Sequence, residues 1–216
     1  MAIQTIHVFD FDGTLCRTPA DSEENLRRYE DACGMPWRIT KADARRLSQE
    51  RGEKVHPRLG WWGRAETLLP PLVPDPTPEE LFNVEVGDAL RDSKQDDDAL
   101  TLLLTGRPIA LRSEVLRILH DGGLVQVERT RRDDGWKCEL ADPSLQCFFK
   151  GNEGPSSRED KPHRTWEWKC WVLEQFLELH PEVGVVEFWE DRPNHADRFE
   201  ALNDAWRPSV KVHRVT

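Results

Sequence analysis

Five short segments rich in apolar and β-branched residues predict the strands of a sheet. Three of them are almost continuously apolar, which is typical of strands buried on both faces of a parallel sheet. The predicted strands are Thr5–Phe11, Leu100–Thr105, Leu145–Phe149, Val183–Trp189 and Val210–Val215.

Segments with a helical period lie between these strands. In "ALRSEVLRILH", Ala110–His120, the apolar residues fall on one stripe, and similar spacing recurs in Trp166–His180 and His195–Trp206. Alternation of strand and helix implies right-handed βαβ units. The pattern therefore predicts an α/β fold, with a doubly wound, Rossmann-like parallel sheet of about five strands flanked by helices.

Two stretches interrupt this alternation. Residues 17–98 are more than a crossover between the first two strands needs, so we expect an inserted helical, cap-like region within a single domain, 1–216. Residues 150–164 are polar and rich in Gly and Pro, which predicts a loop. The charged segment 128–137 predicts a surface hairpin. Within the insert, helices are expected at Asp21–Cys33, Thr40–Arg51 and Pro78–Leu90, the last with Thr77 as its N-cap.

The composition limits the kinds of binding partner and the cellular compartments that we expect. A net charge of −10 argues against an extensive nucleic-acid surface, although a small pocket for one phosphorylated end is compatible with it. The five cysteines are odd in number and show no CxxC spacing, so neither a disulfide framework nor a zinc site is indicated. No segment approaches the roughly 20 apolar residues of a membrane span. We therefore expect a cytoplasmic or nuclear protein that does not contact membranes.

Polar residues with catalytic chemistry follow the predicted strands, at the sheet edge where α/β folds bind ligands. After the first strand, Asp10 and Asp12 project to the same side of an extended segment. Asp10 could attack phosphorus as a nucleophile, and Asp12 could protonate the leaving oxygen and later activate water. A lone DxD has a simpler explanation as solvated turn residues.

Two further groups suit a phosphate. After the second strand, the Thr105 hydroxyl, the backbone N–H groups at Gly106 and the Arg107 guanidinium form a candidate phosphate cradle. Lys169, at the start of a predicted helix, could bridge the nucleophile and the phosphate. Lys150 and Lys161 are rivals for that role, and a solvated helix lysine is the simpler alternative.

Two acids follow the fourth strand and suggest a magnesium site. Asp191 lies just past the strand, and Glu190 precedes it. Carboxylates of Asp10 and Asp191, with the backbone carbonyl of Asp12, would give Mg²⁺ oxygen ligands. Glu190 is either a neighbouring ligand or a partner for Arg192.

The order of these motifs resembles the haloacid dehalogenase (HAD) superfamily of aspartate-dependent phosphatases over roughly residues 5–15, 100–120 and 165–206. The strings "VFDFDGTL", "GWW", "LLTGR", the W-x-W-K helix start and "EDRxxH" resemble more closely the HAD domain of Swiss Army Knife RNA repair proteins. That resemblance implies a HAD core and a link to polynucleotide 3′-phosphatases.

The resemblance also implies residue roles. Asp10 is the expected nucleophile, Asp12 the acid/base, Thr105 the phosphate binder, Lys169 the bridging cation and Asp191 a metal ligand. Many HAD enzymes carry a second acid four residues after the first in the last motif, where this chain has His195. The metal site would then depend on Glu190 or on water instead.

The function expected from these residues is Mg²⁺-dependent phosphohydrolysis through an aspartyl-phosphate, with removal of phosphate from RNA or DNA ends as the first hypothesis. A small-molecule or nucleotide phosphatase is the second, which the acidic charge favours. A catalytically silent phosphate-binding module is the third. Trp61 and Trp62 in the insert are candidates for substrate contact, although large aromatic residues also fill cores.

Overall fold

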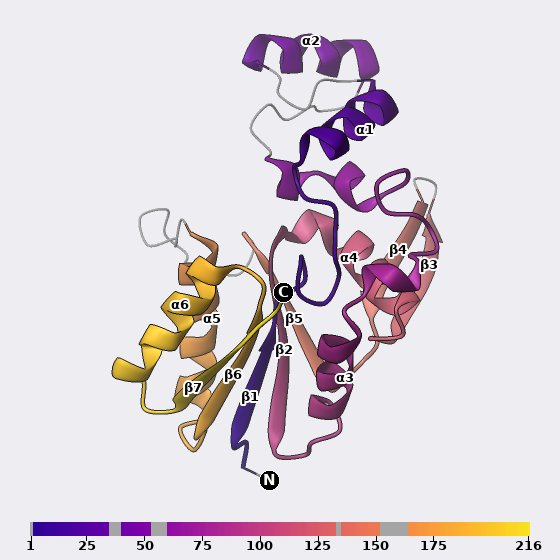
Figure 1. Ribbon diagram of the computed structural model, residues 1–216. Coiled ribbons are helices and arrows are strands. Elements are labelled where there is room, and N and C mark those ends of the chain that lie inside the picture. Colours follow the sequence, from indigo (N-terminus) through magenta and orange to yellow (C-terminus); the bar gives the residue numbers. More distant parts are fainter. Residues whose placement is uncertain (1, 35–39, 53–59, 133–134, 152–163) are drawn as a thin grey trace.

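The computed structural model describes residues 2–34, 40–52, 60–132, 135–151 and 164–216 (Figure 1). Five parallel strands form one sheet in the order β5-β2-β1-β6-β7. The strands are β1 Thr5–Phe9, β2 Ala99–Pro108, β5 Leu145–Lys150, β6 Val185–Glu190 and β7 Ser209–Arg214. The predicted α/β fold is therefore confirmed.

β1 lies at the centre of the sheet and pairs with β2 on one side and β6 on the other. From β1 the chain builds β2 and β5 outward in one direction, and then returns to build β6 and β7 in the other. This reversal creates a crevice at the carboxyl ends of the central strands. The candidate motifs follow those strands.

Helices cover both faces of the sheet (Figure 1). On one face, α5 (Thr165–Leu179) and α6 (Pro193–Glu200) pack over a cluster that includes Ile6, Val8 and Phe188. On the other, α3 (Val84–Ser93) and α4 (Arg112–Asp121) enclose a second cluster. Alternate residues of β1 enter different clusters, since Phe9 belongs to the second. The same alternation turns Asp10, which follows Phe9, toward the α5 face.

The insert rises beyond the carboxyl edge of the sheet, where α1 (Glu23–Cys33) and α2 (Lys41–Arg51) lie (Figure 1). It continues through short 3-10 turns, which include Trp61–Gly63 and Ala65–Leu68. The division into one domain with an insert at 17–98 stays a prediction.

The third helix of the insert differs from the expectation. The segment Pro78–Leu90 was predicted to be helical throughout, but α3 begins only at Val84, and Asn83 rather than Thr77 is its N-cap. Thr77 instead accepts a hydrogen bond from Arg117, whose guanidinium also donates to the Leu68 carbonyl. This buried arginine of α4 fastens the proline-rich part of the insert to the core.

The predicted surface hairpin is present, as the antiparallel pair β3 (Val127–Arg132) and β4 (Gly135–Leu140). The predicted loop 150–164 lies mostly outside the described residues. Across the described part of the chain, none of the helices combines the length and the apolar character that crossing a bilayer requires.

Candidate active site

Asp10 sits at the carboxyl end of β1 with only 2% of its surface exposed. Its Oδ2 atom lies 3.0 Å from Lys169 Nζ and 3.1 Å from Arg192 Nη2, and Oδ1 accepts a hydrogen bond from the N–H of Phe11. Burial raises the pKa of Asp10, and the charge of Lys169 opposes that rise. The carboxylate is therefore almost fully buried and held in place by two cations.

Buried Glu190 forms ion pairs with the same two cations, Lys169 and Arg192. Its Oε2 lies 2.7 Å from Lys169 Nζ, and its Oε1 lies 3.1 Å from Arg192 Nε. Despite burial, these cations hold the pKa of Glu190 well below its usual range. His195 Nδ1 approaches Oε1 only to 3.5 Å. Both oxygens of Glu190 thus face cations, which fits the partner role better than the ligand role.

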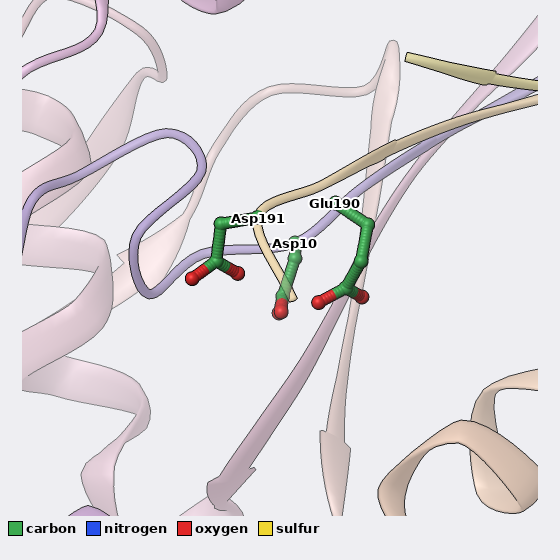
Figure 2. Close-up of side chains that lie close together, drawn as sticks. All are labelled: Asp10, Glu190 and Asp191. Carbon is green, nitrogen blue, oxygen red and sulfur yellow. The ribbon is translucent and has the colours of Figure 1, made fainter. Parts of the chain in front are cut away.

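Asp191 completes a group of three carboxylates at the ends of β1 and β6 (Figure 2). One oxygen each of Asp10, Glu190 and Asp191 lies within 4.8 Å of the others. Burial raises the pKa of Asp191 to about 6, and the nearby charges of Asp10 and Glu190 add to the rise. Among the described residues, no cationic side chain forms an ion pair with Asp191.

The local backbone explains the position of Asp191. Gly13 has a φ of +75°, and a Cβ there would overlap the Asp191 carboxylate. Thr14 Oγ1 accepts a hydrogen bond from the Asp191 N–H. The sharp turn after Asp12 therefore brings this carboxylate against the first strand end. Three carboxylates against two cations leave one negative charge, so the donor set fits a divalent cation held by Asp10 and Asp191.

Asp12 faces a different set of partners. Arg107 Nε donates to both of its carboxylate oxygens at 2.9 and 3.1 Å, and Arg107 Nη2 donates to Oδ1 at 2.7 Å. Thr18 Oγ1 donates to the same Oδ1 at 2.6 Å. The carboxylate of Asp12 is thus fixed in orientation at the pocket wall.

Arg107 was expected to contact phosphate, and the structure gives its side chain other partners. The guanidinium is fully buried, and all of its nitrogens donate to protein atoms. Thr105 is also fully buried, and its hydroxyl accepts a hydrogen bond from the Arg107 N–H. A direct phosphate contact by either side chain stays a prediction and would require rearrangement of these bonds.

The carboxylates open into a cavity of about 250 Å³. Gly106 and Thr165, the first residue of α5, form part of its wall, and Trp62 borders it from the insert. Asp10, Asp12, Gly13, Thr18, Ala20, Asp191 and Arg192 complete the lining. Of the three residues of the predicted phosphate cradle, Gly106 is the one that lines this cavity.

The two candidate tryptophans differ in their burial and their contacts. Trp61 is only 2% exposed, packs with Tyr29 and Leu72, and donates its indole N–H to the Pro19 carbonyl. Trp62 is 40% exposed and borders the cavity. Trp61 is thus closed off from the cavity that Trp62 borders, and substrate contact by either residue stays a prediction.

Of the rival lysines, Lys169 is the one that contacts Asp10, with 1% of its surface exposed. Lys150 Nζ instead donates to Thr165 Oγ1. Lys161 lies outside the described residues. The contact with Asp10 gives Lys169 the position expected of the bridging cation.

Sequence reasoning missed three residues of the site. Arg192 was considered only as a partner of Glu190, yet it also contacts Asp10. Thr18 and Thr165 also belong to the site, and neither is among the candidates that the sequence indicates. Arg192 directly follows the acid pair, which was a usable signal. Thr18 and Thr165 carry no comparable signal, because each is a single polar residue outside any motif.

The chain is similar to several known proteins. The family model for HAD domain family 1 in Swiss Army Knife RNA repair proteins matches residues 46–215, a range that begins after Asp10 and Asp12. The uncharacterised protein YMR265C of Saccharomyces cerevisiae is 22% identical over 203 residues. That alignment covers 93% of this chain and 37% of the yeast protein, so the chain spans little more than a third of its relative.

A solved structure was also found to be similar, that of the HAD domain of the effector protein Lem4 from Legionella pneumophila, determined as an inactive mutant. It shares 11% identity with a TM-score of 0.44, and the match covers 98% of this chain and 85% of that one. The family match, which covers well over half of the sequence, identifies this chain as a member of HAD domain family 1 in Swiss Army Knife RNA repair proteins.

Proposed function

We propose that this protein is a Mg²⁺-dependent phosphomonoester hydrolase that acts through an aspartyl-phosphate on Asp10. The observation that carries the proposal is the buried Asp10 carboxylate, held by Lys169 and Arg192 at the base of a cavity and flanked by Asp191. Membership of the HAD family supports the same class of chemistry.

In the proposed reaction, a carboxylate oxygen of Asp10 attacks phosphorus, and the bond from phosphorus to the ester oxygen breaks. Asp12 acts here in its protonated form and gives its proton to the departing oxygen. Asp12 then takes a proton from water, which attacks the phosphorus and releases Asp10 and inorganic phosphate. Lys169 and Arg192 offset the negative charge that gathers around the phosphoryl oxygens.

Magnesium fits the donor set described above. Asp10, Asp191 and the backbone carbonyl of Asp12 would hold the ion, which when bound neutralises charge on the phosphoryl group. Glu190 would act behind this set, because both of its oxygens already face Lys169 and Arg192.

We propose a nucleic-acid end as the substrate. The family is named for RNA repair proteins. The cavity of about 250 Å³ is smaller than the pockets of about 300 Å³ or more that enclose whole ligands, so it suits the phosphorylated end of a longer molecule. The exposed ring of Trp62 offers a surface on which a terminal base could stack.

A small-molecule or nucleotide phosphatase is the second candidate, because a net charge of −10 disfavours a long polyanion. The two candidates differ in salt dependence. Several phosphate contacts would make the affinity for an oligonucleotide fall steeply with salt, whereas a mononucleotide would show a shallow dependence.

The test is Mg²⁺-dependent phosphate release from 3′-phosphorylated and 5′-phosphorylated oligonucleotides, mononucleotides and sugar phosphates. Asp10→Asn should abolish turnover, and Asp97→Asn, in an exposed turn, is the matched control. Preference for an oligonucleotide end supports the first candidate. No turnover on any substrate, with inorganic phosphate still bound, would instead identify a silent binding module.

A further inference from the structure

The side chain of Arg107 joins two parts of the protein that are far apart in sequence. On one side its guanidinium grips the carboxylate of Asp12 through three hydrogen bonds. On the other, Nη1 donates to Thr67 Oγ1 at 2.7 Å and to the Trp62 carbonyl at 3.2 Å. Thr67 and Trp62 belong to the insert, whereas Asp12 directly follows the central strand.

Trp62 is tied to Arg107 by its ring as well as its carbonyl. The guanidinium carbon lies 4.9 Å from the centroid of the Trp62 ring. The same ring is exposed to the cavity. A molecule that fills the cavity against Trp62 would therefore press on a residue stacked against Arg107.

These contacts form a unit because the guanidinium is fully buried. Withdrawing one partner from a buried charge leaves that charge uncompensated, which is strongly unfavourable. If the insert segment containing Trp62 and Thr67 moves away from Arg107, the hydrogen bonds from Arg107 to Asp12 are therefore disturbed as well. Proton transfer in turn requires Asp12 to lie within hydrogen-bond reach of the leaving oxygen.

We propose that Arg107 is a positioning residue that couples the seating of the Trp62–Thr67 segment to the orientation of Asp12. The inference rests on the proposed function, in which Asp12 is the general acid and base. Substrates that hold Trp62 in place keep Asp12 aligned, and substrates too small to reach Trp62 lose part of that alignment. Specificity thus arises at the proton-transfer step as well as in binding.

The coupling itself can be measured without any turnover. Asp12 and Thr67 are each bonded to Arg107, so their effects on stability should be linked through it. In a double-mutant cycle, the melting-temperature shifts of Asp12→Asn and Thr67→Val should fail to add by about 2 °C or more. In an Arg107→Lys background the same two shifts should add.

The control for this cycle is Thr101→Val, which removes another buried threonine hydrogen bond, made to Ser93. Its shift should add to that of Asp12→Asn. Additivity of Asp12→Asn and Thr67→Val in the wild-type background would overturn the proposal.

A second experiment tests the catalytic consequence. Proton donation matters most for a poor leaving group, so an alkyl phosphate and an aryl phosphate with an acidic phenol are compared. Arg107→Lys keeps the charge but loses the fork, and should lower kcat for the alkyl ester at least tenfold more than for the aryl ester, with KM unchanged. Arg117→Lys, which loosens the insert without touching Asp12, should slow both esters equally.

Two outcomes for Arg107→Lys would overturn the inference. A raised KM with unchanged kcat would show that Arg107 contacts the phosphate itself. Equal slowing of both esters would reduce Arg107 to a structural role. Absence of turnover in the wild-type protein would instead remove the proposed function, and the melting-temperature cycle would still decide the coupling.

Discussion

Lys169 Nζ lies 3.0 Å from Oδ2 of Asp10, and both side chains are almost wholly buried. A buried ion pair between a helix start and a strand end is costly to desolvate, so this pair is weak evidence for a contribution to stability. In the proposed reaction, this pair keeps a cation beside the carboxylate that would attack the phosphoryl group.

Substitution of Lys169 should have a larger effect on activity than substitution of Lys150. Lys169→Met leaves two buried carboxylates short of a cation, and we expect kcat to fall at least about 100-fold with a loss of about 3 kcal/mol in unfolding free energy. Lys150→Met, which removes a hydrogen bond to Thr165, should lower kcat less than about tenfold. Steady-state kinetics and thermal unfolding of both variants test this. Comparable losses of kcat would contradict the assignment of Lys169.

Gly13 and Gly123 offer a matched pair of substitutions. Both have a positive φ, at +75° and +63°, so alanine at either position costs about 1–2 kcal/mol of stability. A Cβ at Gly13 would also displace the Asp191 carboxylate, whereas nothing lies near one at Gly123. We expect Gly13→Ala to weaken Mg²⁺ binding and abolish most turnover, and Gly123→Ala to retain both. Calorimetric titration of Mg²⁺ into each variant is the measurement.

The stability of the Mg²⁺-free protein should depend on the protonation of Asp191. Burial raises its pKa from the ordinary 3.8 to about 6, so the folded protein holds this proton more tightly than the unfolded chain. The unfolding free energy should therefore decrease as the pH rises from about 4 to 6, by up to about 1.4 kcal/mol per unit. Asp191→Asn should remove this contribution, and Asp97→Asn should keep it. Identical pH profiles of denaturant unfolding for the wild type and Asp191→Asn would refute the assignment.

The adjacent tryptophans should give opposite phenotypes. Trp61→Ala empties a buried position and should cost about 3–5 kcal/mol of unfolding free energy. Trp62→Ala should leave stability closer to the wild type but raise the KM for a 3′-phosphorylated oligonucleotide about 5- to 150-fold, since stacking of a base on an aromatic ring contributes about 1–3 kcal/mol. Chemical denaturation and kinetics with the oligonucleotide test the pair. An unchanged KM for Trp62→Ala would argue against base stacking.

The sheet could be predicted because its signal is local. Apolar strands and amphipathic helices alternate in the sequence, and the acids at Asp10 and Asp191 directly follow two of those strands. Parallel pairing of β1 with β6 then necessarily brings the strand ends to one edge. The proximity of Asp10 and Asp191 thus followed from topology alone.

The partners of Arg107 could not be predicted in this way. They depend on how the insert folds back onto the sheet edge, and no period in the sequence encodes that path. Trp61 and Trp62 show the same difficulty. They are identical neighbours in the sequence, and only the 3-10 turn that contains both decides which side chain is buried and which is exposed. The extent of α3 was misjudged for a local reason, since the 3-10 turn Glu79–Leu81 interrupts the predicted helix.

The parallel pairing of β1 with β6 also has a consequence for synthesis of the chain. Thr14, in the turn after Asp10, meets Asp191 across a separation of 177 positions. A ribosome therefore delivers Asp10 long before the carboxylate that completes the acidic group, and translation proceeds from the N-terminus at about 5–20 residues per second. For many seconds the nascent polypeptide carries Asp10 without Asp191, so the acidic group can form only when the two strands pair.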